Sequence, residues 1–161
     1  MTFDVIGFGA LNVDKLYKVN MIAKEEEEGF VIDFKEAPGG SAANTIVGLA
    51  RLGLKTGYIG KVAEDREGEL LLNDFRKENV DTSGIIISRK GRSGVVMGYV
   101  DGNGERALYV DPGVNDWLEF KEINLDYAAN TEFLHLTSFV GEKPFEAQKK
   151  LINQLSDVKI S

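Results

Sequence analysis

Hydrophobic and polar residues follow different periods along this chain, and each period predicts a different element. Residues 3–8 form a short apolar run that breaks at glycines, which is typical of a buried strand. Residues 10–19 and 30–34 stay strand-like, and no amphipathic helix begins there. From Ser41 onward, apolar side chains recur at helical spacing as far as Gly53, which stands where a helix C-cap belongs. The first third of the chain therefore predicts three strands and one helix.

The rest of the chain repeats these two patterns. The tripeptide Gly102-Asn103-Gly104 separates two strand-like runs and predicts a hairpin. Acidic residues open the second helical stretch, as expected beside the positive end of a helix dipole. We expect helices over about 65–78 and 144–155, and strands over about 57–62, 85–87, 95–100, 106–110, 133–137 and 158–160.

The order of these elements predicts an α/β fold. Strands and helices alternate in part of the chain, which indicates a parallel sheet. Two stretches, about 12–36 and 85–111, hold strands without helices between them and are expected to build a separate small sheet. The chain stops after a strand, whereas parallel sheets normally carry further helices on both faces. We therefore expect residues 1–161 to be the N-terminal part of a larger, truncated domain.

Composition narrows the class of protein. The chain has 161 residues, of which 43% are hydrophobic and 28% charged, as in globular proteins. Its 19 basic and 26 acidic residues give a net charge of −7, which argues against a nucleic-acid groove or an anionic membrane surface. No apolar run approaches the roughly 20 residues that span a bilayer. The first ten residues hold one acid and no basic cluster, unlike a signal peptide.

Residue types that carry much enzyme chemistry are scarce. There is no cysteine, which excludes disulfide scaffolds, thiolate catalysis and cysteine zinc sites. The single histidine, His135, lies in an apolar strand pattern and is interpreted as a packed or strand-end residue. The acidic run Glu25–Glu28 is interpreted as a solvated turn, with a cation site as the open alternative. We expect a cytoplasmic protein that binds a small molecule, with no nucleic acid and no membrane as partner.

Two short motifs carry polar groups in places that suit a ligand. Gly39 and Gly40 precede a helix, so the backbone can approach a ligand without obstruction by a Cβ atom. Asn44, one turn into that helix, offers a donor and an acceptor, which suits vicinal hydroxyls. Asn12 and Asp14, two apart in extended chain, point to one side and could hold two hydroxyls of one sugar. The alternatives are a tight turn with Ser41 as an N-cap, and two solvated residues at a strand end.

Other candidate sites are weaker. Gly7-Phe8-Gly9 resembles the start of a dinucleotide-binding loop, but Asn12 stands where the third glycine belongs and no helix follows. There is no P-loop sequence. Met97, Tyr99 and Tyr109 on the expected hairpin are interpreted as packing residues, with contact to a ligand as the alternative.

Taken together, these segments resemble the ribokinase-like (PfkB) carbohydrate kinases over essentially the whole chain. The resemblance lies in the order and spacing of six segments, which are residues 9–14, 37–44 with the helix to Gly53, 57–65, Gly68, 79–82 and 112–115. It implies a parallel Rossmann-type sheet with a small β-sheet lid, formed here by about 12–36 and 85–111.

The resemblance also implies a function. Such enzymes transfer phosphate from ATP to a hydroxymethyl group of a sugar, sugar phosphate or nucleoside, and the equivalents of Asn12, Asp14, Gly39, Gly40 and Asn44 hold the acceptor's hydroxyls. The lid covers the acceptor and often pairs with a second copy. Closing the lid would exclude water, which competes as phosphoryl acceptor.

The departures from the family pattern are equally specific. Three features of the family are absent before Ser161. They are the Gly-Ala-Gly-Asp-like segment that supplies the catalytic base, the adenine pocket, and the Asn/Glu motif tied to Mg²⁺. No catalytic residue is therefore assigned, and ATP and Mg²⁺ are implied for the complete enzyme but not expected to bind this chain well. Ser41 stands where ribokinases often have Lys, and residues 136–139 lack the acid that contacts ribose, so ribose itself is not indicated.

Three hypotheses remain. The first is the N-terminal half of a sugar or nucleoside kinase, carrying the acceptor site and lid and inactive by itself. The second is a non-catalytic sugar-binding or dimerisation module, and the third is a complete enzyme of another kind built on this half-fold. A half-sheet exposes an edge and an apolar face, so we expect self-association through the lid or the exposed edge.

Overall fold

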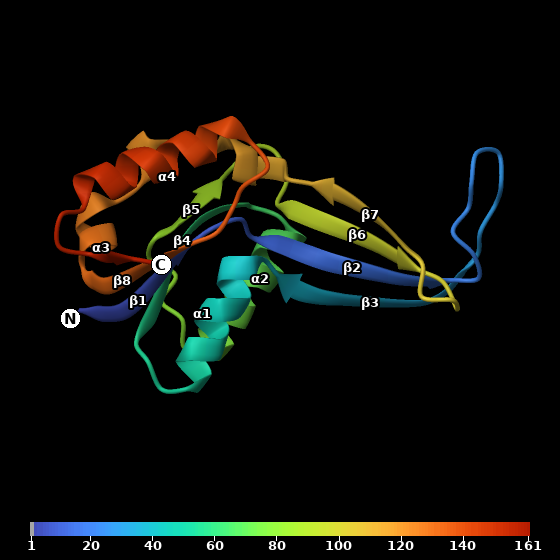
Figure 1. The fold of residues 1–161 in the computed structure, drawn as a ribbon, viewed down its shortest axis with the longest axis horizontal. Helices are drawn as coiled ribbons and strands as arrows, with labels where there is room; N and C mark the ends of the chain where they lie inside the picture. The colour runs from blue at the N-terminus through green and yellow to red at the C-terminus, as the bar shows by residue number, and fades with distance from the viewer. Residues whose placement is uncertain (1) are drawn as a thin grey trace.

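The computed structural model describes residues 2–161 and contains two β-sheets (Figure 1). Met1, part of the expected domain 1–161, lies outside the described residues. The first sheet has five parallel strands in the order β5 (Ile85–Ser88), β4 (Thr56–Ala63), β1 (Phe3–Phe8), β8 (Thr131–Leu136) and β9 (Lys159–Ile160). The second has four strands in the order β3 (Val31–Gly39), β2 (Asn12–Val19), β6 (Gly94–Val100) and β7 (Arg106–Asp111). The expected α/β fold with a separate small sheet is confirmed.

Helices cover both faces of the five-stranded sheet (Figure 1). Neighbouring residues of the central strand point to opposite faces, so Val5 packs with α1 and α2 while Ile6 packs with α4. The helical elements are α1 (Ser41–Arg51), α2 (Arg66–Lys77), the short 3₁₀ turns η1 (Gly113–Trp117) and η2 (Phe120–Glu122), α3 (Leu125–Ala129) and α4 (Glu142–Gln154). No helix within residues 2–161 has the length and apolarity needed to cross a membrane.

The helix ends follow from local chemistry. The Asp65 carboxylate accepts a hydrogen bond from the Gly68 amide at 2.8 Å, which fixes the start of α2. After Arg51 ends α1, Gly53 adopts a φ of +92°, a conformation that favours glycine. Both helices were expected at these places from the sequence, and the hairpin of β6 and β7 was also predicted correctly.

Two boundaries of the small sheet differ from those expected. Its second segment begins at Gly94 and not at about 85, because Ile85–Ser88 pairs in parallel with β4 in the five-stranded sheet. A run of three isoleucines lacks alternation, which is typical of a strand with apolar neighbours on both sides. Its first segment reaches Gly39 and not about 36, with Pro38 tolerated because β3 is an edge strand.

The four-stranded sheet projects away from the helical layer and touches it near α2 (Figure 1). Lys15 of β2 forms an ion pair with Glu67 of α2 at 2.7 Å, and Arg66 pairs with Glu36 of β3. Asp65 accepts hydrogen bonds from the Ser93 amide at 2.8 Å and from the Ser93 hydroxyl at 2.7 Å. These contacts hold the base of the small sheet against the start of α2.

Candidate acceptor-binding site

The candidate residues gather at the carboxyl end of β1, where the chain leaves the five-stranded sheet. From β1 the chain enters β2, and it returns from β3 through Gly39 and Gly40 into α1 (Figure 1). Strand β4 lies on one side of β1 and β8 on the other, so the strand order reverses here. Ligands of open α/β sheets bind outside the carboxyl ends of the strands at such switch points.

The carboxylate of Asp14 lies directly over the α-carbon of Gly39. Asn12 stands opposite Gly39 in the β2–β3 register, and a Cβ atom on Gly39 would collide with the Asp14 carboxylate. Asp14 is half-buried, and no described residue donates a hydrogen bond or forms an ion pair with it. Burial raises the pKa of the Asp14 carboxyl above its ordinary value. A half-buried carboxylate with free lone pairs suits a ligand hydroxyl that donates to it.

Asn12 is oriented by a second asparagine, Asn115, which the sequence reasoning did not identify as a site residue. Asn115 is 1% exposed, and its Nδ2 donates to Asn12 Oδ1 at 3.2 Å. The same amide accepts from the Leu11 N–H at 2.9 Å and donates to the Leu11 and Pro112 carbonyls at 2.8 and 3.0 Å. With its oxygen engaged, Asn12 presents its own NH₂ group, which has no acceptor among the described residues. The only sequence signal was the place of Asn115 in the segment 112–115.

Gly40 is the N-cap of α1, and it has a φ of +116°. A Cβ atom there would collide with the Ala10 carbonyl, so only glycine fits without strain. Ser41 is the first residue of the helix and not its N-cap, and no side chain caps this helix end. The alternative of a Ser41 cap is therefore wrong, and the first amides of α1 remain open to a ligand's oxygen.

Asn44 lies next to this cluster but faces a different hollow. It lines a groove of about 480 Å³ between α1 and α2, together with Gly39. Its side chain is exposed and is hydrogen-bonded to no described residue, including Asn12 and Asp14. The structure thus brings Asn12, Asp14, Gly39 and Gly40 together and places Asn44 at their border.

Other residues considered from the sequence lie apart from the cluster. His135 in β8 has Nδ1 3.2 Å from the Ser161 hydroxyl, which agrees with its interpretation as a strand-end histidine. Glu25–Glu28 occupy an exposed loop between β2 and β3. Within residues 2–161, no group of three or more His, Asp or Glu side chains could hold a metal ion.

Asp65 is a further charged residue beside the site that received no role from the sequence. Burial alone would raise the pKa of its carboxyl, but the hydrogen bonds from Ser93 and Gly68 outweigh burial and lower it. Asp65 thus joins the start of α2 to the loop that enters β6.

Comparison with known proteins identifies the family. Residues 4–158 match the pfkB family carbohydrate kinases. An uncharacterized sugar kinase of Archaeoglobus fulgidus is 45% identical over 115 residues, which are 70% of this chain and 46% of that protein. The chain spans about half the length of the curated relatives it matches.

Solved structures show the same fold. A ribokinase from Thermotoga maritima superposes with a TM-score of 0.87 at 23% identity, over 98% of this chain and 51% of that one. An uncharacterized sugar kinase from Pyrococcus horikoshii, solved in complex with ATP, gives a TM-score of 0.81 at 28% identity, over 97% of this chain and 51% of that one. The resemblance noted in the sequence is confirmed, and the chain belongs to the pfkB family of carbohydrate kinases.

Proposed function

We propose that this chain supplies the acceptor-binding half of an ATP-dependent kinase that phosphorylates a hydroxyl group of a small sugar or nucleoside. The observation that carries the proposal is the Asp14 carboxylate, which is half-buried against Gly39 and has no partner among the described residues. Asn12 offers a donor beside it, held in place by Asn115. A carboxylate and an amide side by side can hold two neighbouring hydroxyls.

Each residue has a distinct part in this proposal. Asn12 and Asp14 bind neighbouring hydroxyls, and Gly39 and Gly40 let the acceptor approach the backbone at the start of α1. Asn44 completes the border of the site. Phosphoryl transfer depends mainly on positioning and on charge stabilisation, so fixing the acceptor is a direct contribution to the rate.

ATP and Mg²⁺ are assigned to the complete enzyme. When bound, ATP supplies the phosphoryl group, and Mg²⁺ neutralises charge that develops on it. The described residues include no cluster of three acids or histidines for a metal ion, and the chain contains no P-loop sequence. The proposal includes weak binding of ATP and Mg²⁺ to this chain and no kinase activity from the chain alone. It also includes a cytoplasmic location.

The four-stranded sheet is proposed to act as a lid and as a contact between copies. Leu16, Leu108 and Val110 share the sheet face of Asp14 and are 46%, 53% and 50% exposed. The two-residue strand β9 leaves a second open edge on the five-stranded sheet. Exposed apolar surface and open edges favour association. Light scattering should show a homo-oligomer, and a monodisperse monomer would contradict this part.

A thermal-shift series tests the function. Ribose, fructose 6-phosphate and adenosine are each added with and without Mg-ATP, to the natural sequence and to Asp14→Asn. We expect one acceptor to stabilise the natural sequence, Asp14→Asn to lose that shift, and the exposed control Asp157→Asn to keep it. If Asp14→Asn kept the full thermal shift, the proposed acceptor site would be rejected. If Mg-ATP alone stabilised this chain, the proposal that the chain binds ATP only weakly would be rejected. If the chain binds the acceptor but shows no kinase activity with any added polypeptide, the alternative of a non-catalytic sugar-binding module would be favoured.

A further inference from the structure

The two faces of the four-stranded sheet have different chemistry. Asn12 and Asp14 point to one face, and Tyr17, an odd-numbered residue of the same strand, points to the other. Tyr17 stands opposite Phe34 of β3 and Tyr99 of β6 in the register, and Tyr109 follows on β7. The successive ring centroids are 4.9, 5.0 and 6.0 Å apart. A row of four aromatic rings, one from each strand, therefore crosses the face that is turned away from the acceptor site.

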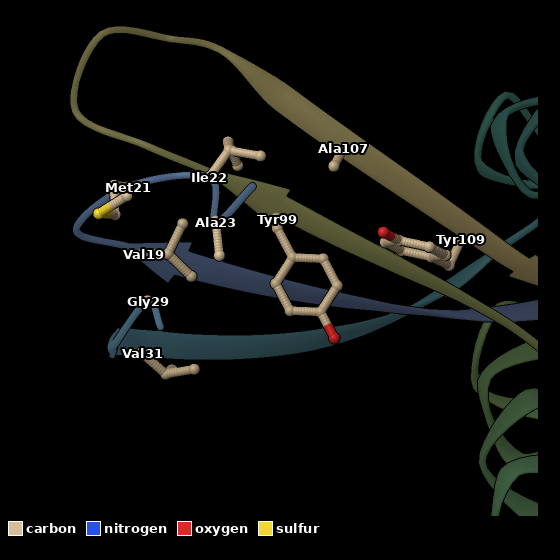
Figure 2. Close-up of a pocket in the computed structure, with 9 residues that line it drawn as sticks. All are labelled: Val19, Met21, Ile22, Ala23, Gly29, Val31, Tyr99, Ala107 and Tyr109. Carbon is tan, nitrogen blue, oxygen red and sulfur yellow. The ribbon is translucent and has the colours of Figure 1, made fainter. Parts of the chain in front are cut away.

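A cavity of about 410 Å³ lies beside this row, at the end of the sheet where the loop between β2 and β3 leaves it (Figure 2). Tyr99 and Tyr109 line it from the sheet, and Met21 and Ile22 line it from the loop between β2 and β3. The planes of the two tyrosine rings lie at 83° to each other, with the ring centroids 6.0 Å apart. Tyr109 is 62% exposed, and neither hydroxyl has a partner among the described residues. A cation over the face of a tyrosine ring is attracted by the ring quadrupole, and aromatic residues around a hollow recognise quaternary ammonium groups in this way.

The charge of the loop agrees with that geometry. Met21, Ala23 and Gly29 line the cavity, and the four acids Glu25–Glu28 stand between them in the same loop. All four are exposed, and none forms an ion pair with a described residue. Lys24 is the only basic residue in this loop, so the field at the cavity attracts cations. A second copy seated here would bring two acidic loops together, which disfavours a homodimer through this face.

We propose that this cavity binds a small organic cation of the quaternary or alkyl ammonium class. The cation lies in the hollow that is lined by the Tyr99 and Tyr109 rings and by the apolar side chains Met21, Ile22 and Val31. Negative charge on Glu25–Glu28 favours its approach. The site is separate from the acceptor site, because it lies on the opposite face of the sheet, and it stands whether or not the proposed kinase function is correct.

Choline and its neutral isostere 3,3-dimethyl-1-butanol test the proposal, because they differ mainly in charge. Binding is followed by NMR through the tyrosine ring resonances. We expect choline to bind at least about fivefold more tightly than the isostere, as a cation–π contribution requires. Equal affinity of the two compounds, or no binding of choline, would overturn the proposal.

Two variants locate the binding. Tyr109→Leu should weaken choline binding at least about fivefold, because it removes one ring wall. Tyr109 is largely exposed, so this variant is expected to fold, and its far-ultraviolet circular dichroism checks that. Phe34→Leu, at the far end of the aromatic row and outside the cavity, is the matched control and should bind as the natural sequence does. This location would be rejected if Tyr109→Leu left the choline affinity unchanged, or if Phe34→Leu lowered that affinity equally.

A third variant tests the charge. A variant in which all four residues Glu25–Glu28 are replaced by Gln should bind choline more weakly and bind the isostere with unchanged affinity. Raising the salt concentration should weaken choline binding in the natural sequence and much less in this variant, since exposed charges are screened by salt. Equal salt dependence in both proteins would contradict the role of the acidic loop.

Discussion

The side-chain Nδ2 of Asn115 lies 3.2 Å from Oδ1 of Asn12, although 103 positions separate the two residues in the sequence. Asn115 lies in the short η1 turn and not in a strand. Its buried amide also makes hydrogen bonds to Leu11 and Pro112. One side chain therefore joins the exit of β1, the start of β2 and the return from β7. Asn12, which is proposed to bind the acceptor, is thus oriented by a residue that lies outside its own strand.

Asn115→Ala should destabilise the fold by about 2–4 kcal/mol, because it leaves the buried amide and carbonyl groups of Leu11 without a partner. Urea denaturation measures this loss. The exposed hairpin residue Asn103 provides the control, since Asn103→Ala removes a side chain without such contacts and should change stability by less than about 0.5 kcal/mol. Equal stability of both variants would show that the Asn115 network contributes nothing.

Gly39→Ala should abolish acceptor binding, because its Cβ atom would displace the Asp14 carboxylate. Calorimetric titration with the acceptor found by thermal shift measures the effect. Gly48→Ala is the matched control, since Gly48 lies in α1 with no atom within 4 Å of an added Cβ. That control should keep binding and gain about 0.5–1 kcal/mol of stability from helix propensity. Normal binding by Gly39→Ala would remove Asp14 from the site.

Asp65→Ala should cost about 2–3 kcal/mol at pH 7, because α2 loses its N-cap and Ser93 loses two hydrogen bonds. The folded pKa of Asp65 is lowered, so its contribution is present above its unfolded pKa of about 3.9 and is lost as the pH falls through the folded pKa. Stability measured by urea from pH 7 to pH 2.5 should show the difference shrinking below about pH 4. The neighbouring exposed Glu64→Ala is the control, and a difference that persists at low pH would contradict the assignment.

Features set by local chemistry were predictable from the sequence. The acidic residues of its first turn and the amphipathic stretch placed α2, and Gly102 to Gly104 placed the hairpin turn. Asn12 and Asp14 were expected on one side of a strand because residues two apart share a face, and the structure brings both next to Gly39.

Features set by distant pairing were not predictable in this way. The isoleucines at 85–87 form a strand in either sheet, and only the partner β4 decides which. Nothing near Asn115 indicates that its amide reaches Leu11 and Asn12. The direction in which Asn44 points depends on how α1 packs against β1 and β4, which a single helical repeat does not specify.

The raised pKa of Asp14 implies a conflict between stability and binding. A carboxylate whose folded pKa is raised holds its proton more tightly in the folded state. Its favourable contribution is complete below its unfolded pKa of about 3.9 and is lost as the pH rises through the folded pKa. At pH 7 the ionised Asp14 therefore destabilises the protein without ligand.

Asp14→Asn should accordingly raise the melting temperature of the free protein at pH 7, by roughly 1–2 °C because solvent screens a half-exposed carboxylate. The gain should disappear below about pH 4, where the aspartate is protonated in both states. The same variant should bind the acceptor about 10–100-fold more weakly, since a hydrogen bond to a charged group contributes about 1.5–3 kcal/mol. Calorimetric titration and melting curves on one preparation measure both effects. If Asp14 served only the fold, replacing it would lower the stability of the protein and leave its affinity for the acceptor unchanged. The reason is that a structural carboxylate has partners within the protein, whereas a binding carboxylate is left free for its ligand.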